Sequence, residues 1–300
     1  MAASTVPAAF DAFLATIVPT PNQRGTIKGR LSVADGLLRQ HFPGPGPAVP
    51  LEPGSNMPLV RTALIGSAAK DTLIRPIDDV DVLAVFSNTH KAYEAYQANS
   101  QTFLYRVREA LCGNRIETVG ARGQAVRLFY TDGGHVDIAP VFQRSDSGFL
   151  LPAGDGSWLT TDPELATSWL AQRDAALGHH LRPLVRMLKA WNRAHSSRLR
   201  SFHLETVAGR LFTSLGPNYR QNLLVFFQHA AGHLAIDDPT GHGGNLDSYL
   251  TASARAAVES SIATAFQRSQ NAVLAEAAGD HRQAIGLWGL TLGPEFPSYG

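Results

Sequence analysis

The residues best suited to chemistry lie in the stretch Ala63–Phe86, which reads as two apolar strands joined by a Gly-Ser turn and a short helix opening. In the second strand, residues 79–82 alternate between aspartate and valine. Side chains two apart on a strand point to the same face, so Asp79 and Asp81 project together. Two carboxylates ~4 Å apart repel by about 1 kcal/mol in water and by about 4 kcal/mol at an effective dielectric of ~20. A divalent cation removes that repulsion, and oxygen ligands of this kind suit Mg²⁺.

A third carboxylate follows on a predicted hairpin. Residues 126–139 read as two apolar stretches joined by a Gly-rich turn, and Asp137 interrupts the second stretch. If this hairpin lies beside the strand of Asp79 and Asp81, the three carboxylates converge and can hold two metal ions ~3.5–4 Å apart. Such a pair of ions serves in-line displacement at phosphorus, because one activates the attacking hydroxyl and the other neutralises the leaving pyrophosphate.

The turn at Gly66-Ser67 fits the same chemistry. Glycine lets the backbone approach phosphates, and the amides at the start of the following helix bind anions. Asp78 points to the opposite face of the strand from Asp79, so we expect it to be exposed rather than to bind the metal in place of Asp79. The alternative to a metal site is a solvated acidic strand end beside an ordinary turn.

Composition narrows the class of protein. The chain has 300 residues, of which 44% are hydrophobic and 17% charged, with a formal net charge of +1. This balance does not suit a protein that grips a long nucleic acid, which usually shows a clustered basic excess. The single Cys112 excludes an internal disulfide and a multi-cysteine zinc site. With no apolar run long enough for a membrane span and no secretory pattern at the start, we expect a cytoplasmic protein.

The elements that position these residues follow from hydrophobic periodicity. We expect helices over 8–18 and 22–42, a Pro- and Gly-rich loop over 43–55, a strand pair over 59–86, a helix over 88–112 and a hairpin with its continuation over 115–143. The segment 148–162 reads as a crossing between modules or as an irregular loop on the substrate side. We therefore expect a catalytic module over 1–160 and a helical module over 161–300.

The second half is predicted to be helical, with helices over 180–192, 219–236 and 247–278. On the first of these, Arg182, Arg186 and Lys189 form a stripe separate from the apolar face. This stripe is either a solvated basic face or a binding surface. The next helix opens with Ser201-Phe-His-Leu-Glu205, which favours the second interpretation when the two are taken together.

The order and spacing of the Gly-Ser turn, the Asp-x-Asp strand and the distal aspartate resemble the DNA polymerase β-like nucleotidyltransferase superfamily. The Leu-x-x-Trp-Asn helix, the segment 201–205 and the loop 238–245 narrow the resemblance. With these, the chain resembles the cyclic GMP–AMP synthase and oligoadenylate synthase group, and within it the bacterial cyclic-oligonucleotide synthases of anti-phage defence. The resemblance covers nearly the whole chain.

This resemblance implies an α/β (α+β) fold: a polymerase β-like catalytic core with a mixed sheet, followed by a C-terminal helical lobe. It also implies a role for each matching residue. The metal-binding triad would be Asp79, Asp81 and Asp137, and the phosphate-binding turn would be Gly66 and Ser67. Lys189 and Ser201 would contact the donor triphosphate. Phe202 would be the aromatic that stacks on a base, with core packing as the alternative. Such a base contact is worth ~1–3 kcal/mol in single-strand binders.

One departure from the family pattern concerns the residues after the turn. Asp71 stands where the family often has a glycine or a small polar residue. A negative charge there puts a role of Lys70 as a phosphate ligand in doubt.

The function implied by the resemblance is the joining of nucleoside triphosphates, ATP and/or GTP or others, into a cyclic di- or trinucleotide second messenger. Two Mg²⁺ ions would assist, with Mn²⁺ as an alternative, and no stable nucleic acid or membrane partner is expected. Two other functions stay open. One is a transferase that makes linear oligonucleotides or modifies an RNA end or a small molecule. The other is a non-catalytic binding protein on the same fold.

Three further features carry weaker expectations. His135 shares a strand face with Asp137 and either touches a nucleotide or is exposed to solvent. His229 and His233 lie one helical turn apart, but no neighbouring Glu or Cys completes a metal site, so a helix surface or core pair is the better interpretation. Some bacterial relatives are conjugated through their last residue by ubiquitin-like machinery, and Gly300 on an exposed tail would suit that reaction.

Overall fold

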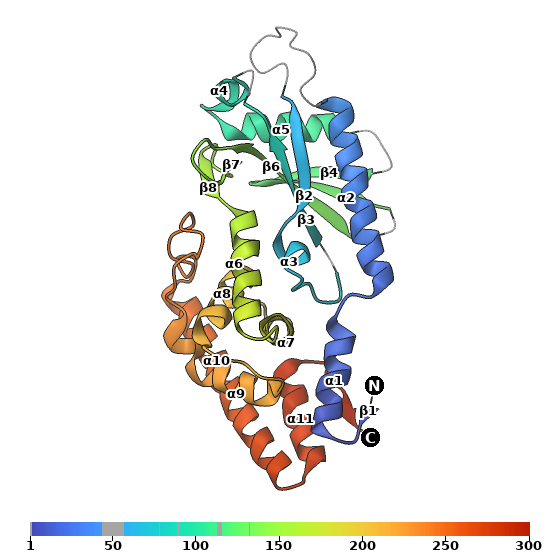
Figure 1. Ribbon diagram of the computed structural model, residues 1–300, viewed down its shortest axis with the longest axis vertical. Coiled ribbons are helices and arrows are strands. Elements are labelled where there is room, and N and C mark those ends of the chain that lie inside the picture. Colours follow the sequence, from blue (N-terminus) through green and yellow to red (C-terminus); the bar gives the residue numbers. More distant parts are fainter. Residues whose placement is uncertain (1, 44–56, 78, 89–90, 113–115, 132) are drawn as a thin grey trace. The chain divides into compact units, whose positions relative to one another are not determined.

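A mixed sheet lies at the centre of one part of the chain (Figure 1). The computed structural model describes residues 2–43, 57–77, 79–88, 91–112, 116–131 and 133–300, with the backbone alone for 116–122. Within these residues the sheet has seven strands in the order β2-β3-β6-β5-β4, with β7 paired to β6 and β8 to β7. The strands are β2 (Leu59–Leu64), β3 (Asp79–Phe86), β4 (Ile116–Arg122), β5 (Ala125–Tyr130), β6 (His135–Gln143), β7 (Phe149–Pro152) and β8 (Trp158–Thr161).

The central pair, β3 and β6, is parallel, whereas the other pairs are antiparallel. The first half of β3 alternates between accessible and buried residues, and Leu83–Phe86 are all buried. A strand that is covered on both faces needs such a continuous apolar run, whereas a strand end with one open face alternates. The predicted strand pair over 59–86 and the hairpin of β5 and β6 are therefore confirmed, and the polar residues lie at the open end of the sheet.

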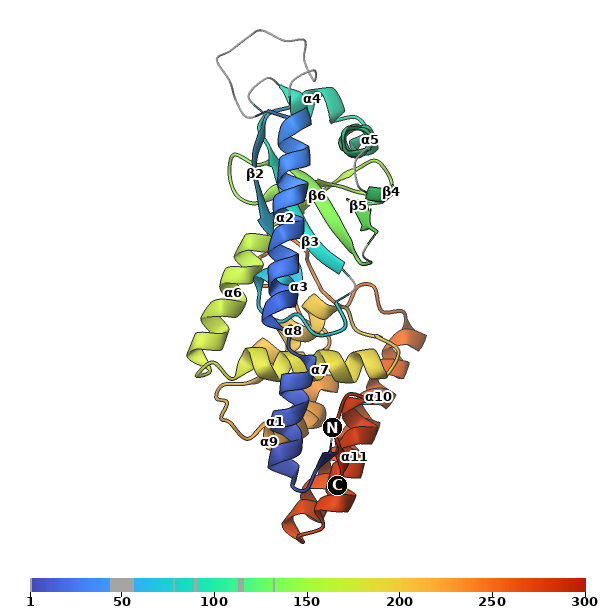
Figure 2. The ribbon, with the colours of Figure 1, turned by 90° about the vertical axis from the view of Figure 1, so that its right-hand side faces the viewer.

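Helix α2 (Pro21–His41) runs along this sheet and contacts β2 (Figures 1 and 2). It starts at a capping box, in which Thr20 accepts a hydrogen bond from the Gln23 amide and the Gln23 side chain accepts one from the Thr20 amide. Its apolar stripe buries Ile27, Ala34 and Leu38. The helix agrees with the predicted one, and most of the predicted loop after it lies outside the described residues.

The single helix expected over 88–112 is wrong. The structure has two helices, α4 (Ala92–Tyr96) and α5 (Ser100–Leu111). The helical conformation is interrupted at Asn99, whose backbone is extended and whose side chain accepts a hydrogen bond from the Gln101 amide. An asparagine in this position caps a new helix instead of continuing the old one.

The segment 148–162 is neither a crossing nor an irregular loop. It forms a β-hairpin of β7 and β8 that extends the sheet at the end of β6. Aromatic side chains explain this: Trp158 lies 5.2 Å from Tyr93 and 5.8 Å from Phe142, measured between ring centroids. The glycines and serines that suggested a loop occupy the turn between the two strands.

The described residues divide into two compact units. Residues 20–70 and 77–167 form the sheet unit, and residues 1–19, 71–76 and 168–300 form the helical unit. The first 19 residues, which we expected in the catalytic module, thus belong to the helical unit. No helix in the described part of the chain is long and apolar enough to cross a membrane.

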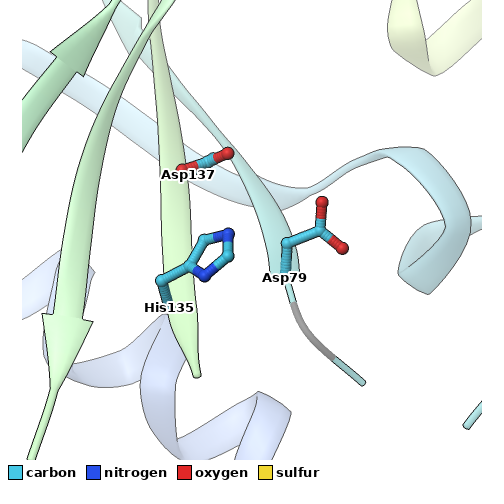
Figure 3. A group of neighbouring side chains, drawn as sticks. All are labelled: Asp79, His135 and Asp137. Carbon is cyan, nitrogen blue, oxygen red and sulfur yellow. The ribbon is translucent and has the colours of Figure 1, made fainter. Parts of the chain in front are cut away.

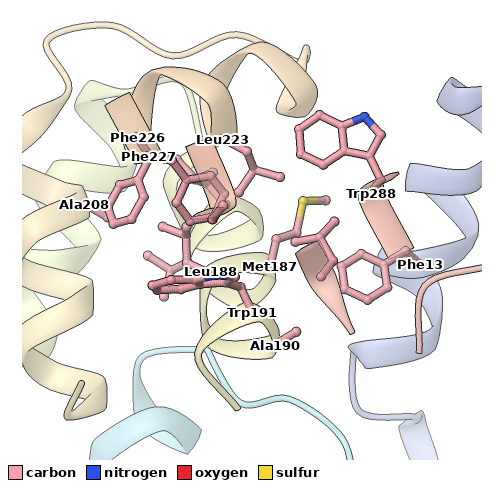
Figure 4. Close-up of a cluster of buried hydrophobic side chains, with 14 of the residues drawn as sticks. Phe13, Met187, Leu188, Ala190, Trp191, Ala208, Leu223, Phe226, Phe227 and Trp288 are labelled. Atoms are coloured by element: carbon pink, nitrogen blue, oxygen red, sulfur yellow. The ribbon is translucent and has the colours of Figure 1, made fainter. Parts of the chain in front are cut away.

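Large apolar side chains fill the core of the helical unit (Figure 4). Its helices are α1 (Val6–Ile17), most of α6 (Pro163–Ala176), α7 (Leu181–Ala194), α8 (Ser201–Leu211), α9 (Tyr219–His229), α10 (Ala252–Ala277) and α11 (His281–Leu292), with a 3-10 turn η1 (Ala230–His233). Helix α7 buries its predicted face, from Leu181 to Trp191, and side chains of α1, α9 and α11 pack around it. The helices predicted over 180–192 and 247–278 are confirmed to within five residues, whereas the helix predicted over 219–236 is too long, because α9 ends at His229 and a 3-10 turn follows it.

Both chain ends lie in the helical unit, where β1 (Ala2–Ala3) pairs in parallel with β9 (Ser298–Tyr299). Residues 298–300 are exposed, and the Gly300 amide donates a hydrogen bond to the Ala3 carbonyl. The last residues are therefore exposed, as expected, and form a short strand.

Candidate functional site

The register of β3 and β6 places polar residues side by side. Asp79 pairs with His135, and Asp81 pairs with Asp137. Paired residues on parallel strands lie next to each other on the same face, and residues two apart share a face. All four side chains therefore lie on one face, while Val80 and the other intervening residues are buried on the other. The expectation that the hairpin lies beside the Asp79/Asp81 strand is confirmed.

Three of these side chains meet closely (Figure 3). Asp79, His135 and Asp137 each offer one oxygen or nitrogen atom, and these atoms all lie within 4.8 Å of one another. Asp79 is exposed, and the other two are partly buried. The donor set consists of carboxylate oxygens and a ring nitrogen, which are ligands that divalent cations accept. The arrangement thus fits a divalent metal site that is open on one side.

Asp81 also faces Gly66, the first residue of the single helical turn α3 (Gly66–Ala69). Gly66 has a φ of +61°, a conformation that side chains other than glycine rarely adopt. A Cβ atom at this position would collide with Oδ2 of Asp81. The Ile65 amide also donates a hydrogen bond to the Asp81 carbonyl, at 3.0 Å, which ties the turn to β3. Glycine is therefore required here because the turn approaches a site carboxylate.

Arg127 on β5 binds Asp137 on β6 through two hydrogen bonds. Its Nε donates to Oδ1 at 2.7 Å and its Nη2 donates to Oδ2 at 2.6 Å. Both side chains are less than one-fifth exposed. The hydrogen bond to Asp137 raises the pKa of the Arg127 guanidinium, and the charges of Asp137, Asp79 and Asp81 raise it further, against the opposing effect of burial. The guanidinium thus offsets part of the negative charge of the cluster.

Ser67 follows Gly66 in α3 of the sheet unit, and the other predicted site residues belong to the helical unit. Lys189 lies on α7, and its Nζ is 3.6 Å from Oε1 of Glu205 on α8. Glu205 is buried and also accepts a hydrogen bond from Thr72 at 2.7 Å. Ser201 and Phe202 begin α8, where Ser201 is exposed and Phe202 is half-buried. Their roles at a nucleotide stay predictions.

The basic stripe on α7 is not a solvated face. Arg182 binds Asp174 at 3.1 Å, and Arg186 binds Oδ2 of Asp71 at 2.8 Å. The negative charge of Asp71, which put Lys70 in doubt as a phosphate ligand, is therefore paired with an arginine. Lys70 itself is buried, with 5% of its surface exposed. Asp78, expected to be a bystander, lies outside the described residues.

Two residues at these sites were missed in the sequence. The role of Arg127 could be predicted only from the register of the hairpin. The role of Glu205 could be predicted only from the packing of α8 against α7. His229 and His233 are exposed, as their interpretation as a helix surface requires. His135 was considered as a nucleotide contact or an exposed residue, and the structure instead places it in the cluster with Asp79 and Asp137.

Comparison with known families adds an independent finding. Residues 4–174 match the family described as Second Messenger Oligonucleotide or Dinucleotide Synthetase domain. This match covers more than half of the chain and includes the strands that carry the carboxylates.

Individual relatives resemble the chain over most of its length. The cyclic AMP-AMP-AMP synthase of Acinetobacter sp. (strain ATCC 27244 / 9458) is 27% identical over 266 residues, which cover 79% of this chain and 73% of the relative. Among solved structures, E. coli MS115-1 CdnC in complex with HORMA-deltaN superposes with a TM-score of 0.75 at 20% identity, over 97% of this chain and 98% of the other. Vibrio cholerae DncV cyclic AMP-GMP synthase, in complex with the linear intermediate 5′ pppA(3′,5′)pG, superposes with a TM-score of 0.73 at 14% identity, over 97% and 95% of the two chains. The structural likeness supports the nucleotidyltransferase fold.

Proposed function

We propose that this chain, which belongs to the family of Second Messenger Oligonucleotide or Dinucleotide Synthetases, joins nucleoside triphosphates into a cyclic di- or trinucleotide at its carboxylate cluster. The chain is a nucleotidyltransferase of this family. The proposal extends this to the residues that act, the metal ions, the substrates and the product.

The observation that carries the residue assignment is the register of β3 and β6. Asp137 lies directly beside Asp81, and Asp79 lies two residues from Asp81 on the same face. Three carboxylates from strands distant in sequence therefore share one open face. Holding them together costs repulsion, which makes sense when a cation is bound. Had Asp137 been on the far side of the sheet, the three residues could not have acted on one phosphate.

We assign the metal sites to Asp79, Asp81 and Asp137, with Mg²⁺ as the physiological ion and Mn²⁺ as an alternative. Two such ions, when bound, would make an attacking ribose hydroxyl more acidic and neutralise the leaving pyrophosphate. The carboxylates hold and orient, and no covalent enzyme intermediate is required. Gly66 and Ser67 would let the backbone of the turn approach the triphosphate. Positioning and electrostatics then supply the rate.

For the helical unit we assign Lys189 and Ser201 to the donor triphosphate and Phe202 to a base. The exposed Ser201 and the half-buried Phe202 at the first turn of α8 are consistent with this. Lys189 would then divide its charge between Glu205 and the phosphates.

The substrates we propose are nucleoside triphosphates, with ATP first. The Acinetobacter relative is named a cyclic AMP-AMP-AMP synthase, and the E. coli relative has been solved with ATP. The DncV structure with a linear dinucleotide intermediate supports a stepwise order for this chain as well, in which a linear product forms first and is then closed. Base choice and ring size follow from the experiment below.

The test is the product. Purified protein is incubated with all four nucleoside triphosphates and Mg²⁺ or Mn²⁺, and the products are identified by mass spectrometry after phosphatase treatment. We expect a phosphatase-resistant cyclic product and release of pyrophosphate. Asp79→Asn and Asp137→Asn should reduce the rate by about 10²–10³-fold, because each removes a charge from the site of phosphoryl transfer. Asp155→Asn is the matched control, because Asp155 is an exposed carboxylate in the turn between β7 and β8.

The same experiment separates the alternatives. A phosphatase-sensitive product with free ends would favour a transferase that makes linear oligonucleotides. Incorporation that requires an added RNA end or small molecule would favour a modifying enzyme. Absence of pyrophosphate release with either ion, from protein that binds nucleotide, would favour a non-catalytic binding protein.

We also propose a role in anti-phage defence, which rests on the family resemblance alone. It predicts that phage infection raises the cyclic nucleotide level in cells carrying the chain with its neighbouring genes. It further predicts that Asp79→Asn abolishes both the nucleotide signal and the protection in plaque assays. Protection that persists in this variant would contradict the proposed role.

A further inference from the structure

His135 is the one residue of the described metal cluster that is not a carboxylate. It is the first residue of β6 and pairs in register with Asp79. Figure 3 shows its imidazole below Asp137 and beside Asp79, with one ring nitrogen turned toward the space between the two carboxyl groups. The ring is held from the other side by Phe129, whose centroid lies 5.8 Å away.

One nitrogen of this ring has no partner. Nε2 of His135 is buried, and within the described residues no hydrogen-bond partner reaches it. A buried polar atom left without a partner costs about 1–3 kcal/mol, so such atoms are rare and need a reason. A nitrogen that faces two carboxylates, but lies within hydrogen-bond distance of no group among the described residues, is well placed to donate its lone pair to a cation.

The distances agree with this interpretation. Bonds from a metal ion to nitrogen or oxygen ligands are about 2.0–2.2 Å long, so two ligands of one ion lie up to about 4.4 Å apart. The donor atoms of Asp79, His135 and Asp137 lie within 4.8 Å of one another. Movements of a few tenths of an ångström would therefore suffice to close the set around one ion. Asp137 can take part while it binds Arg127, because each carboxylate oxygen has two lone pairs.

We propose that His135 is a nitrogen ligand of one of the two divalent cations, together with Asp79 and Asp137. This inference rests on the proposed function, because it concerns the same metal site. A nitrogen ligand changes the selectivity of that site. Mg²⁺ takes oxygen ligands, whereas imidazole favours first-row transition metals and carboxylates accept Mn²⁺. His135 therefore shifts the selectivity of this one site toward Mn²⁺, whereas a site formed by carboxylates alone suits Mg²⁺.

The test uses the full chain with Mn²⁺ alone, without nucleotide. Pulsed electron paramagnetic resonance detects nitrogen nuclei bound to Mn²⁺. We expect ¹⁴N coupling in the wild-type protein and its replacement by ¹⁵N coupling when the histidines are labelled with ¹⁵N. His135→Asn should remove the coupling and weaken Mn²⁺ binding at least about tenfold, in the range seen when metal-site partners are lost. Mg²⁺ binding, measured by competition, should change less than about threefold because it does not rely on nitrogen.

Two controls make the result specific. His233→Asn alters an exposed histidine of the helical unit and should leave both the coupling and the Mn²⁺ affinity unchanged. Asp79→Asn should weaken binding of both ions. The isotope experiment needs no substitution, so absence of the coupling would overturn the proposal even if His135→Asn fails to fold.

The proposal is overturned if Mn²⁺ binds the wild-type protein without nitrogen coupling, or if His135→Asn keeps the coupling. Binding of the nitrogen to an ordered water or to a nucleotide would give the first of these results. Failure of this proposal and failure of the proposed function give different results. A cyclic product formed with Mg²⁺ and no nitrogen coupling with Mn²⁺ would contradict the role of His135 and leave the proposed function in place. Nitrogen coupling without any cyclic product would support His135 as a ligand and contradict the proposed function.

Discussion

Arg127 forms a bidentate salt bridge with Asp137, with hydrogen bonds of 2.7 and 2.6 Å to the two carboxylate oxygens. The geometry is the bidentate one that guanidinium and carboxylate groups favour. Its consequence is twofold: the bonds fix the orientation of Asp137 on β6, and the positive charge reduces the repulsion from the other site carboxylates. Arg127 therefore offsets part of the negative charge of the cluster and competes with a cation for the same carboxylate.

Replacement of Arg127 by Gln should tighten divalent cation binding and slow the reaction. A unit charge ~4 Å from another contributes about 1 kcal/mol even in bulk water, so we expect Mn²⁺ to bind at least about threefold more tightly without it. The rate should fall about tenfold or more, because Asp137 loses the bonds that orient it. Metal titration by electron paramagnetic resonance and initial rates of pyrophosphate release measure the two effects.

Arg127→Lys is the control, since it keeps the charge and loses the bidentate geometry. It should bind Mn²⁺ as the wild-type protein does and still react slowly. Weaker or unchanged Mn²⁺ binding in Arg127→Gln would show that the guanidinium does not compete with the cation.

Gly66→Ala should impair the reaction strongly while the fold persists. A φ of +61° costs a residue with a Cβ about 1–2 kcal/mol, and the new methyl group would meet the Asp81 carboxylate. Either the turn or Asp81 must move, so metal binding and turnover should both decrease. Nucleotide turnover, Mn²⁺ affinity and the thermal midpoint of unfolding are the measurements.

Gly36→Ala is the matched control for this substitution. Gly36 lies within α2, and a Cβ atom there has no heavy atom within 4 Å. Alanine in a helix is more stable than glycine by about 0.5–1 kcal/mol, so this variant should unfold at a slightly higher temperature and retain full activity. If Gly66→Ala were equally active, the close approach to Asp81 would have no part in the reaction.

The sequence was sufficient to predict the strand positions of the three carboxylates, because a period of two is a local property of the chain. Asp79 and Asp81 had to share a face once the strand was identified. The hairpin that carries Asp137 was recognisable from its Gly-rich turn. The parallel pairing of β3 with β6 could only be assumed, since non-local pairing leaves no local signal. Its register, with Asp81 beside Asp137, comes from the structure.

The partner of Asp137 shows where sequence reasoning stopped. The simplest hairpin over this segment pairs Tyr130 with His135 and would place Leu128 opposite Asp137. The structure pairs Phe129 with His135, which brings Arg127 opposite Asp137 instead. A shift of one residue exchanges the two faces of a strand, and turn chemistry alone does not fix it. Arg127 was therefore missed although its position on the hairpin was known.

Two further differences have separate causes, one local and one tertiary. Asn99 ends one helix and caps the next, which periodicity over 88–112 did not separate. The Gly- and Ser-rich segment 148–162 pairs as β7 and β8 because Trp158 packs on the aromatic cluster of the sheet unit. At Asn99 a local helix cap outweighed the apolar periodicity, whereas over 148–162 contacts with distant aromatic residues outweighed the loop-like composition.

Lys189→Met should raise the KM for nucleoside triphosphates and destabilise the helical unit. Its ammonium group lies 3.6 Å from the buried Glu205, and loss of the pair leaves that carboxylate with fewer partners, at a cost of about 1–3 kcal/mol. Lys189→Arg should retain most of the stability. Initial rates as a function of nucleotide concentration and thermal unfolding measure the two roles.

Thr72→Val separates the two roles of Lys189. It removes the hydrogen bond to Glu205 without removing a charge, so we expect a loss of about 1 kcal/mol in stability and no change in KM. If Lys189→Met changes stability as this control does and leaves the KM unaltered, the contribution of Lys189 is structural and its assignment to the triphosphate is wrong.

His203 should make the helical unit less stable in acid. The side chain is 1% exposed, its Nε2 lies 2.8 Å from the Leu234 carbonyl, and its Nδ1 lies 3.1 Å from the Tyr249 hydroxyl. Burial lowers the pKa of His203 below the ordinary value of 6.5, against the effect of the bond to Leu234, and the charge of Arg255 lowers it further. Between the lowered pKa and 6.5, the unfolded chain binds a proton that the folded chain does not.

Stability from this group is therefore complete above pH 6.5 and decreases as the pH falls below it. We expect the thermal midpoint to drop between pH 7.5 and pH 5, and His203→Gln, which cannot take up a proton here, to lose this part of the drop. His233→Gln, at an exposed position, should behave as the wild-type protein does. A midpoint that rises toward pH 5, or an equal drop in His203→Gln, would mean that His203 is not the group that titrates.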